Sequence, residues 1–458
     1  MILAVDCGST NLKGALFTSD LKKQSESSVP VPYLRLDAER AELDPEALWS
    51  AFLRLVNDVA HAVTLDPACI AVVAIGSQAQ TFTLLDAYGR PRIPFLSWMD
   101  NRARAEAEEW RQQIGNDFHR HCSFPHPLPA LQLSLLLWVR RHWPDVWRQA
   151  ARLVTLPGYL AWRLSRIHAL DDNLAAMQGL YSMVHRSWRS EILDRLELPR
   201  DWLPSLVRCG ERLIPSSRAG DSPWLGWRPA IVLAGNDHTV GAVGNEDGTP
   251  HVLTTFGTAL VAYHRPGPDP GPYHPAGIWG PYPGGGYYEL GVWGEGGAAL
   301  DWACARLCPG KKASTLDAWA ASVPPSDDVL FFPERARGVL AWLGAGSREK
   351  RARAVLEGIL YALRRLLDRD LEIPPDRPLT AIGGGSRSAV WMQMAADVTG
   401  RPVRIGKGDA LLGAAVLASG ETRPPSLPVG PVFQPDPERQ ALYERIFARW
   451  LAAWEAAH

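Results

Sequence analysis

The stretch Ala230-Ile-Val-Leu-Ala-Gly-Asn-Asp-His-Thr-Val-Gly-Ala-Val-Gly244 decides how the rest of the chain is interpreted. Its first residues form a short apolar run that is typical of a buried strand. Gly235 interrupts the run, Asp237 follows at once, and the small residues after it predict a closely packed helix. A buried carboxylate needs a partner, a metal ion or a catalytic task. On this stretch alone, the N-cap of that helix is the better explanation of Asp237.

The composition is that of a globular protein with balanced charge. Of the 458 residues, 46% are hydrophobic and 21% are charged, and the formal net charge is -1. This balance gives no electrostatic reason to expect a nucleic-acid partner. The apolar runs are shorter than the roughly 18–20 residues of a membrane span, and the N-terminus lacks the features of a secretory signal. We therefore expect a cytoplasmic protein without a membrane partner.

The chain is long for a single hydrophobic core, which predicts two domains. A loop-rich stretch over residues 201–229 separates two series of expected strands and helices. We therefore expect a first domain over residues 1–228 and a second over residues 229–458. The second domain would end in an amphipathic helix over residues 438–454.

Four glycine- or hydroxyl-rich turns each follow an expected strand. They are Gly8–Asn11, Asn236–Gly244, Gly257-Thr258 and Gly383–Ser388. Nests of backbone N–H groups bind phosphate oxygens, and glycines let a nucleotide approach the backbone closely. Four such turns, divided between both halves, favour a nucleotide held between two domains. A Walker-type loop is excluded, because no G-x-x-x-x-G-K-[ST] pattern is present.

Asp6 ends the first apolar run, as Asp237 ends the later one. The first turn therefore has two explanations. It is a plain hairpin turn built from turn-forming residues, or it is a phosphate-binding turn beside a carboxylate that holds hydrated Mg²⁺.

A competing motif lies in the middle of the chain. An expected strand over residues 287–293 leads into Gly294-Glu-Gly-Gly-Ala-Ala299, which fits the dinucleotide-binding pattern G-x-G-x-x-[GA]. Asp317 falls near the position of the acidic residue that such sites use. This short motif gives many false matches, and a complete βαβαβ unit does not precede it, so a NAD-dependent dehydrogenase is the least favoured alternative.

Several motifs, in order along about residues 1–420, resemble the FGGY family of sugar and polyol kinases, especially its xylulokinase-like members. They are Asp6-Cys-Gly-Ser-Thr10, Gln78 with Leu84-Leu85-Asp86, Trp98-Met-Asp-Asn-Arg102, Gly235-Asn-Asp237, Gly257-Thr258, Leu356-Glu-Gly358, and Gly383-Gly-Gly-Ser-Arg-Ser388 with Trp391, Gln393 and Asp397. The resemblance implies an α/β, two-domain actin-like (ribonuclease H-like) ATPase fold with an interdomain cleft.

The resemblance also implies roles for individual residues. Asp237 corresponds to the catalytic base, and Asp6 and Asp237 to the carboxylates near Mg²⁺. The implied ATP-binding residues are Gly8, Ser9, Thr10, Asn11, Gly257, Thr258, Gly383, Gly384, Gly385 and Ser386. The implied substrate-binding residues are Gln78, Gln80, Trp98, Asp100, Asp237 and His238.

Simpler explanations stay open for some of these residues. Trp98 is also explained as a core aromatic, His238 as a structural histidine with satisfied hydrogen bonds, and Gln78 and Asn11 as turn formers.

The sequence departs from the family pattern where the sugar is selected. Ala79-Gln80 stands where xylulokinase-like members carry Met-His and glycerol kinases carry Arg-Glu. Further departures are Leu135 for a lysine, Leu174 for a polar residue, Trp342 for a glycine, and His238 for an Asn or Gln. They concern the choice of substrate more than the reaction.

We therefore expect an ATP-dependent kinase that phosphorylates a hydroxyl of a ketose, with a pentulose such as xylulose as the first candidate. The alternatives are another sugar or polyol (a hexulose, ribulose or a tetritol) and a catalytically silent actin-like regulator. The sequence leaves a homodimer open, and it assigns neither the sugar nor the hydroxyl that is phosphorylated.

Overall fold

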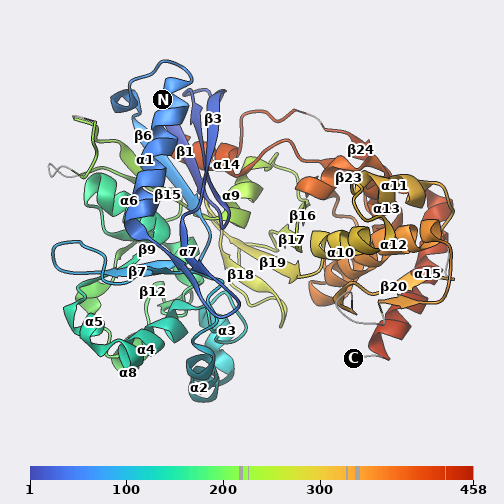
Figure 1. Ribbon diagram of the computed structural model, residues 1–458, viewed down its shortest axis with the longest axis horizontal. Helices are drawn as coiled ribbons and strands as arrows, with labels where there is room; N and C mark the ends of the chain where they lie inside the picture. Colours follow the sequence, from blue (N-terminus) through green and yellow to red (C-terminus); the bar gives the residue numbers. More distant parts are fainter. Residues whose placement is uncertain (216–219, 225, 326–327, 336–340, 429, 457–458) are drawn as a thin grey trace.

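The computed structural model describes residues 1–215, 220–224, 226–325, 328–335, 341–428 and 430–456. Figure 1 shows two lobes, with most of the first half of the chain in one and most of the last third in the other. Each lobe is built around a mixed β-sheet that is covered by helices. The two-domain α/β prediction is confirmed at this level.

The first sheet contains the strand that carries Asp6 and the strand that ends directly before Asp237. Its order is β14 (Arg212–Leu213), β15 (Ala230–Asn236), β6 (Val72–Ser77), β1 (Ile2–Cys7), β2 (Asn11–Phe17) and β3 (Lys23–Pro30). The expected hairpin is present as the antiparallel pair β1–β2. The strand β6 is parallel to both β1 and β15, so these three strands end at the same edge of the sheet.

Helices cover both faces of the first sheet, and the strand residues alternate between them. Leu3 and Val5 pack toward α1 (Pro45–His61) and α6 (Leu156–Ser165). Ile2 and Ala4 point the other way, toward α9 (Asp237–Gly244) and α14 (Ala410–Ser419). Side chains in a strand alternate with a period of two, so the central strands β1, β6 and β15, which are covered on both faces, need apolar residues at nearly every position.

The same half of the chain adds a second layer beside this sheet. It consists of a five-stranded sheet, two strand pairs and several short helices, namely β4 (Tyr33–Leu36), β5 (Ala41–Leu43), β7 (Phe82–Leu85), β8 (Phe95–Leu96), β9 (Arg152–Thr155), β10 (Ala169–Asp171), β11 (Tyr181–Ser182), β12 (Ser187–Trp188), β13 (Ser205–Val207), α2 (Arg104–Ile114), α3 (Phe118–His121), α4 (Gln132–His142), α5 (Pro144–Gln149), α7 (Asp172–Ala176) and α8 (Ser190–Leu196). Between residues 104 and 149 this layer is mostly helical.

The second large sheet belongs to the other half of the chain. Its order is β18 (Ile278–Pro281), β19 (Tyr287–Trp293), β17 (Leu260–His264), β16 (Val252–Phe256), β22 (Leu379–Ile382), β23 (Val403–Ile405) and β24 (Val432–Phe433). The remaining elements of this half are α10 (Gly297–Leu307), α11 (Ser314–Ala321), α12 (Arg348–Arg365) with a π-helical turn Leu366–Asp370, α13 (Ala389–Thr399), α15 (Pro437–Glu455), β20 (Leu330–Phe331) and β21 (Trp342–Leu343). The expected C-terminal helix corresponds to α15.

The change from the first sheet to the second occurs after α9. The expected boundary at residues 228 and 229 falls before β15, but β15 pairs with β6 of the first sheet. The helix α14 also returns from the second half to pack on β1 and β6. The composition of a loop cannot predict these contacts, because they join segments that lie far apart in the sequence.

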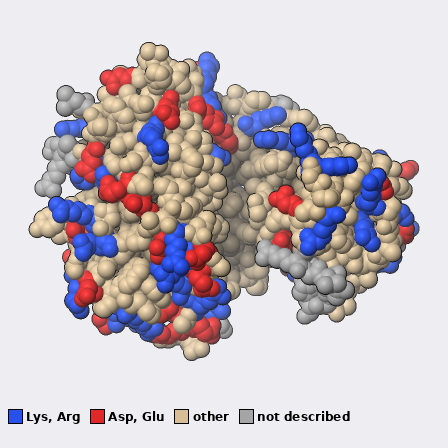
Figure 2. Space-filling view, viewed as in Figure 1, with Lys and Arg blue, Asp and Glu red and all other residues tan. Residues whose placement is uncertain are grey.

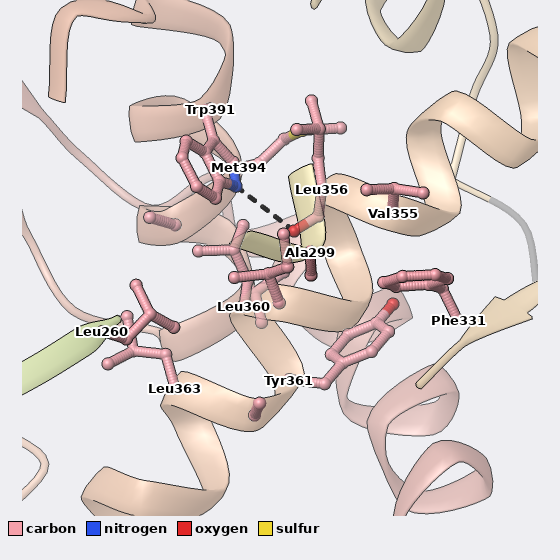
Figure 3. Packing of buried hydrophobic residues seen from close by; sticks show 14 of the residues in the cluster. Leu260, Ala299, Phe331, Val355, Leu356, Leu360, Tyr361, Leu363, Trp391 and Met394 are labelled. Atoms are coloured by element: carbon pink, nitrogen blue, oxygen red, sulfur yellow. Dashed lines mark hydrogen bonds between the residues drawn. The ribbon is translucent and has the colours of Figure 1, made fainter. Parts of the chain in front are cut away.

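The core of the second half is built on α12. This helix begins after Ser347, whose side chain accepts a hydrogen bond from the backbone N–H of Lys350. Figure 3 shows Leu356, Leu360 and Leu363 of α12 among other buried apolar side chains. The indole N–H of Trp391 in α13 donates to the carbonyl of Leu356 at 3.2 Å, which fixes the position of α13 on α12.

The two lobes leave a hollow between them on the face shown in Figure 2. In the part of the chain that the structure describes, no helix has the length and hydrophobicity needed to span a lipid bilayer.

Leu360→Ala tests the packing of this core. Leu360 is fully buried, so the substitution should leave a cavity and lower the free energy of unfolding by about 2–5 kcal/mol. Urea unfolding followed by tryptophan fluorescence measures the change. Leu343→Ala is the matched control, because Leu343 is 48% exposed and its loss should change the free energy by less than about 0.5 kcal/mol. Equal effects of the two substitutions would contradict this packing.

Candidate functional site

Three parallel strands bring the predicted polar residues of the first half to one edge. In the register of the sheet, Asp6 lies opposite Gly76, and Ser77 lies opposite both Cys7 and Asn236. Gln78 and Asp237 are therefore the first residues beyond the ends of β6 and β15. Ligand sites of open α/β sheets lie at such carboxyl ends.

Asp6 has an unusual environment for a carboxylate. Among the described residues, its buried Oδ1 atom has no hydrogen-bond partner. Burial raises the pKa of Asp6 to about 6, the negative charge of Asp237 adds to this rise, and Lys13 opposes it. A second carboxylate close to a buried, unpartnered one is destabilising unless a cation or a protonated group joins them.

The turn after β1 contacts the end of β6. The backbone N–H of Gly8 donates to the carbonyl of Asn11 at 3.1 Å, and the Gln78 side-chain amide donates to the carbonyl of Gly8 at 3.3 Å. The side-chain oxygen of Gln78 is buried and without a partner among the described residues. Thr10 is exposed, while Ser9 and Asn11 are half-buried. Gln78 therefore supports the turn and also has a free acceptor.

Asp237 does not cap the helix that follows it. The N-cap of α9 is Asn236, whose side-chain oxygen accepts a hydrogen bond from the backbone N–H of Thr239. Asp237 is the first helical residue, and its carboxylate accepts a single described hydrogen bond, from the backbone N–H of His238 at 3.0 Å. The capping explanation of Asp237 is therefore wrong, and its carboxylate keeps acceptor capacity for another group.

The glycine turns of the second half meet at the ends of two parallel strands. The strand β16 is parallel to β22, so Gly257-Thr258 and Gly383 follow neighbouring strands. Gly383 has a φ of 91°, and a Cβ atom there would lie 2.8 Å from the carbonyl oxygen of Phe256. The hydroxyl of Ser386 donates to the carbonyl of Gly383 at 2.8 Å. This geometry restricts the position of Gly383 to glycine.

The dinucleotide-binding alternative does not fit the sheet. The strand β19 is antiparallel to both of its neighbours, β17 and β18, whereas the dinucleotide-binding fold uses parallel strands. The backbone N–H of Gly297 instead donates to the carbonyl of Gly257 at 2.7 Å. The Gly294–Ala299 segment thus supports the Gly257 turn. The local motif did not predict this contact.

The residues expected to contact the sugar differ in their exposure. Gln80 is 8% exposed and has a φ of 61°, which is uncommon for a residue with a side chain. Trp98 is 43% exposed, so the core explanation of this residue is wrong. Among the described residues, the His238 ring makes no hydrogen bond that would give it a structural role.

Asp100 is the exception among them, because it is fully buried in an ion-pair network. Its Oδ2 atom accepts hydrogen bonds from Arg102 at 2.7 Å and from the backbone N–H of Ala41 at 3.0 Å. Its Oδ1 atom accepts from Arg102 as well, at 2.8 Å. The same guanidinium pairs with Glu42. These partners occupy the carboxylate and favour support of the neighbouring Trp98 segment over direct contact with a ligand.

Two charged residues near the aspartates were not among the predicted site residues. Lys13 on β2 lowers the pKa of Asp6, and Asp409 before α14 raises it. Asp409 caps α14 and pairs with Lys23 at 3.0 Å. No local signal marks Asp409, because it comes near Asp6 only through the packing of α14 on the first sheet.

The same family matches both halves of the chain. Residues 1–244 match the N-terminal domain of the FGGY family of carbohydrate kinases, and residues 253–420 match its C-terminal domain. The chain belongs to the FGGY family of carbohydrate kinases. It is therefore a phosphotransferase that acts on an alcohol group, as the resemblance of its motifs implied.

Individual relatives agree with this membership. A xylulose kinase of Escherichia coli (strain K12) is 28% identical, over 97% of this chain and 96% of its own. A glycerol kinase of Gloeobacter violaceus is 29% identical, over 99% of this chain and 96% of its own. The crystal structure of xylulose kinase from Rhodospirillum rubrum superposes with a TM-score of 0.89 at 22% identity and covers 100% of this chain and 98% of its own. The predicted actin-like fold of two α/β domains is confirmed.

The residues at the first edge fit a magnesium ion. FGGY kinases use ATP, generally with Mg²⁺. Mg²⁺ prefers carboxylate and water oxygens and is usually held by one or two carboxylates together with substrate phosphates. Asp6, with its unpartnered oxygen, and the nearby Asp237 supply such carboxylates.

Gly383→Ala tests the geometry of the second glycine turn. The added Cβ would meet the Phe256 carbonyl in a backbone conformation reserved for glycine, so the free energy of unfolding should fall by about 1–3 kcal/mol. Differential scanning calorimetry of the ligand-free protein measures this change. Gly384→Ala is the matched control, because a Cβ there has no described neighbour within 4 Å. An unchanged Gly383→Ala protein would contradict the assigned geometry.

Proposed function

We propose that this carbohydrate kinase transfers the γ-phosphoryl group of ATP to a hydroxyl of a ketopentose, with D-xylulose as the first acceptor to test. The observation that carries the reaction is the pair of carboxylates at the ends of β1 and β15, of which Asp6 has a buried oxygen without a partner in the part of the chain that the structure describes. Phosphoryl transfer requires positioned phosphates, neutralised charge and a base for the attacking hydroxyl.

In this proposal Asp237 is the base. Asp237 is the first residue of α9, and among the described residues its carboxylate accepts one hydrogen bond. Its remaining acceptor sites can take the proton of the attacking hydroxyl as the phosphoryl group is transferred. Asp6, with Asp237, would hold Mg²⁺ through water, and the ion supplies charge neutralisation at the phosphates when it is bound. Closure of the two lobes around the ligands would exclude water, which competes with the sugar hydroxyl.

The ATP-binding residues follow from the two glycine-rich edges. The turn Gly8–Asn11 and the turn Gly257-Thr258 would hold the phosphates through backbone N–H groups. Gly383, Gly384, Gly385 and Ser386 would hold the adenosine. In support, a Cβ at Gly385 would lie 2.5 Å from the Trp391 ring, whereas Gly384 has open space above it.

The acceptor subsite would be formed by Gln78, Gln80, Trp98 and His238 beside Asp237, with Asp100 in support. Gln80 and Ala79 are both nearly buried and uncharged, which differs from the Arg-Glu pair of glycerol kinases at these positions. A neutral amide and an exposed indole suit a sugar, because they combine hydrogen bonds with an apolar ring face. The cytoplasmic location and a homodimer stay predictions.

A panel of acceptors tests the substrate class. ADP release, measured by a coupled assay with D-xylulose, D-ribulose, D-fructose, erythritol and glycerol, should give a kcat/KM for D-xylulose at least about tenfold above that for glycerol. A preference for glycerol or erythritol would overturn the ketopentose proposal but keep the kinase. ATP binding without acceptor-stimulated turnover would favour a regulatory protein.

Asp237→Asn tests the proposed base. The substitution keeps the shape of the side chain but removes its basicity, so kcat should fall by about 10²–10⁴-fold. The dissociation constant of ATP, measured by isothermal titration calorimetry, should stay within about twofold.

The control for this variant is Asp86→Asn, because Asp86 accepts hydrogen bonds in a surface turn after β7. Asp86→Asn should leave kcat unchanged. Near-normal turnover by Asp237→Asn would remove Asp237 from the role of base.

A further inference from the structure

We propose that Asn173 is a positioning residue that holds Asp237 in place through a buried network of hydrogen bonds. This inference rests on the proposed role of Asp237 as the base. Asn173 lies on the short helix α7, which packs against both β15 and β18. In Figure 1, α7 lies where the first lobe meets the strands β18 and β19 of the second sheet.

The Asn173 side chain is fully buried, and both of its polar atoms are saturated with hydrogen bonds. Its Oδ1 atom accepts from the backbone N–H of Asn236 at 2.9 Å and from the Asn236 side chain at 2.7 Å. Its Nδ2 atom donates to the Thr239 hydroxyl at 3.1 Å and to the carbonyl of Pro281 at 2.8 Å. One amide thus contacts residues on both sides of Asp237 in the sequence.

The local backbone is shaped to permit this contact. The strand β15 has an irregular register between Leu233 and Asn236, and Gly235 within it has a φ of 84°. A Cβ atom at Gly235 would lie 2.9 Å from the Asn173 Oδ1 atom. Glycine at this position lets the strand end approach the amide closely, in a conformation that other residues rarely adopt.

The helix that carries Asn173 is itself fixed. Asp171 caps α7 by accepting a hydrogen bond from the backbone N–H of Leu174 at 2.9 Å. Asp172 accepts a hydrogen bond from the backbone N–H of Cys209 at 2.9 Å. These two contacts fix the start of α7, which carries Asn173, and tie it to the segment that follows β13.

The network also reaches the second sheet. The Thr239 hydroxyl lies 3.1 Å from the hydroxyl of Tyr263 on β17, and the Pro281 carbonyl belongs to β18. Among the described residues, the Asp237 carboxylate, in contrast, accepts only a local hydrogen bond from the backbone N–H of His238. A buried network with all its hydrogen bonds made is rigid, whereas a partly satisfied one is costly. The Asn173 amide holds the backbone on both sides of Asp237 through such a network, so the position of the Asp237 carboxylate depends on it.

Asn173→Leu tests this role, with kinetics separated from folding. The acceptor is whichever of D-xylulose, D-ribulose and glycerol gives the fastest ADP release with the unmodified protein, or water if none does. Misplacement of the base should lower kcat about 100-fold, while KM for ATP stays within about twofold. Gln178→Leu is the matched control, because Gln178 is a fully buried amide after α7 that donates to the Leu174 carbonyl and not to β15. It should keep kcat.

A second measurement separates positioning from general destabilisation. In an Asp237→Ala background, Asn173→Leu should cause no further loss of the residual rate, because the group that it positions is already absent. If Asn173→Leu does not fold, Thr239→Val is used instead, because it removes the hydroxyl that the Asn173 amide contacts. It should lower kcat and leave the KM for ATP unchanged.

The outcomes separate this inference from the proposed function. Near-normal turnover of Asp237→Ala would overturn the proposed base itself. Loss of turnover in Asp237→Ala, together with normal kcat in Asn173→Leu or equal loss in Gln178→Leu, would overturn the role of Asn173 alone.

Discussion

The parallel pairing of β6 with both β1 and β15 is the constraint on which the site depends. It places Asp6 and Asp237 at one edge of a buried sheet, although they lie 231 positions apart in the sequence. Burial raises the pKa of Asp6, and the negative charge of Asp237 raises it further, because two carboxylates in such a place repel each other. Such an arrangement is costly unless something else stabilises it, and in the proposed function the metal nucleotide does so.

Much of the fold could be predicted from local pattern. The expected strand over residues 287–293 matches β19 in full, and the expected helix over residues 438–454 lies within α15. The pattern of apolar residues within each segment is sufficient to predict it. The hairpin β1–β2 was predictable for the same reason.

Long-range pairing was not predictable in this way. The composition of residues 201–229 suggests a boundary, but β15 belongs to the first sheet because it pairs with β6, which lies far earlier in the chain. The Gly294–Ala299 motif is a second example. Whether it binds a dinucleotide depends on the direction of the neighbouring strands, and the motif itself does not contain that information. The capping of α9 by Asn236, with the buried partner Asn173, likewise depends on a contact that joins distant segments.

The candidate site was predicted mostly through the resemblance to the kinase family. Strand pairing and hydrogen bonds in the structure then distinguish the residues that lie together from those with a supporting role. The structure brings Asp6, Gln78 and Asp237 to one edge, and Gly257 and Gly383 to another. The two edges belong to different sheets, which α9 and α14 join through a shared core. Asp100 differs from the other predicted sugar contacts, because its carboxylate is already engaged by Arg102.

A crystal structure with a non-hydrolysable ATP analogue, Mg²⁺ and D-xylulose tests the central claim most directly. The account predicts one nucleotide that contacts the Gly257 and Gly383 turns, with its terminal phosphate facing Asp6 and Asp237. A nucleotide bound away from either edge, or a terminal phosphate far from both aspartates, would contradict it.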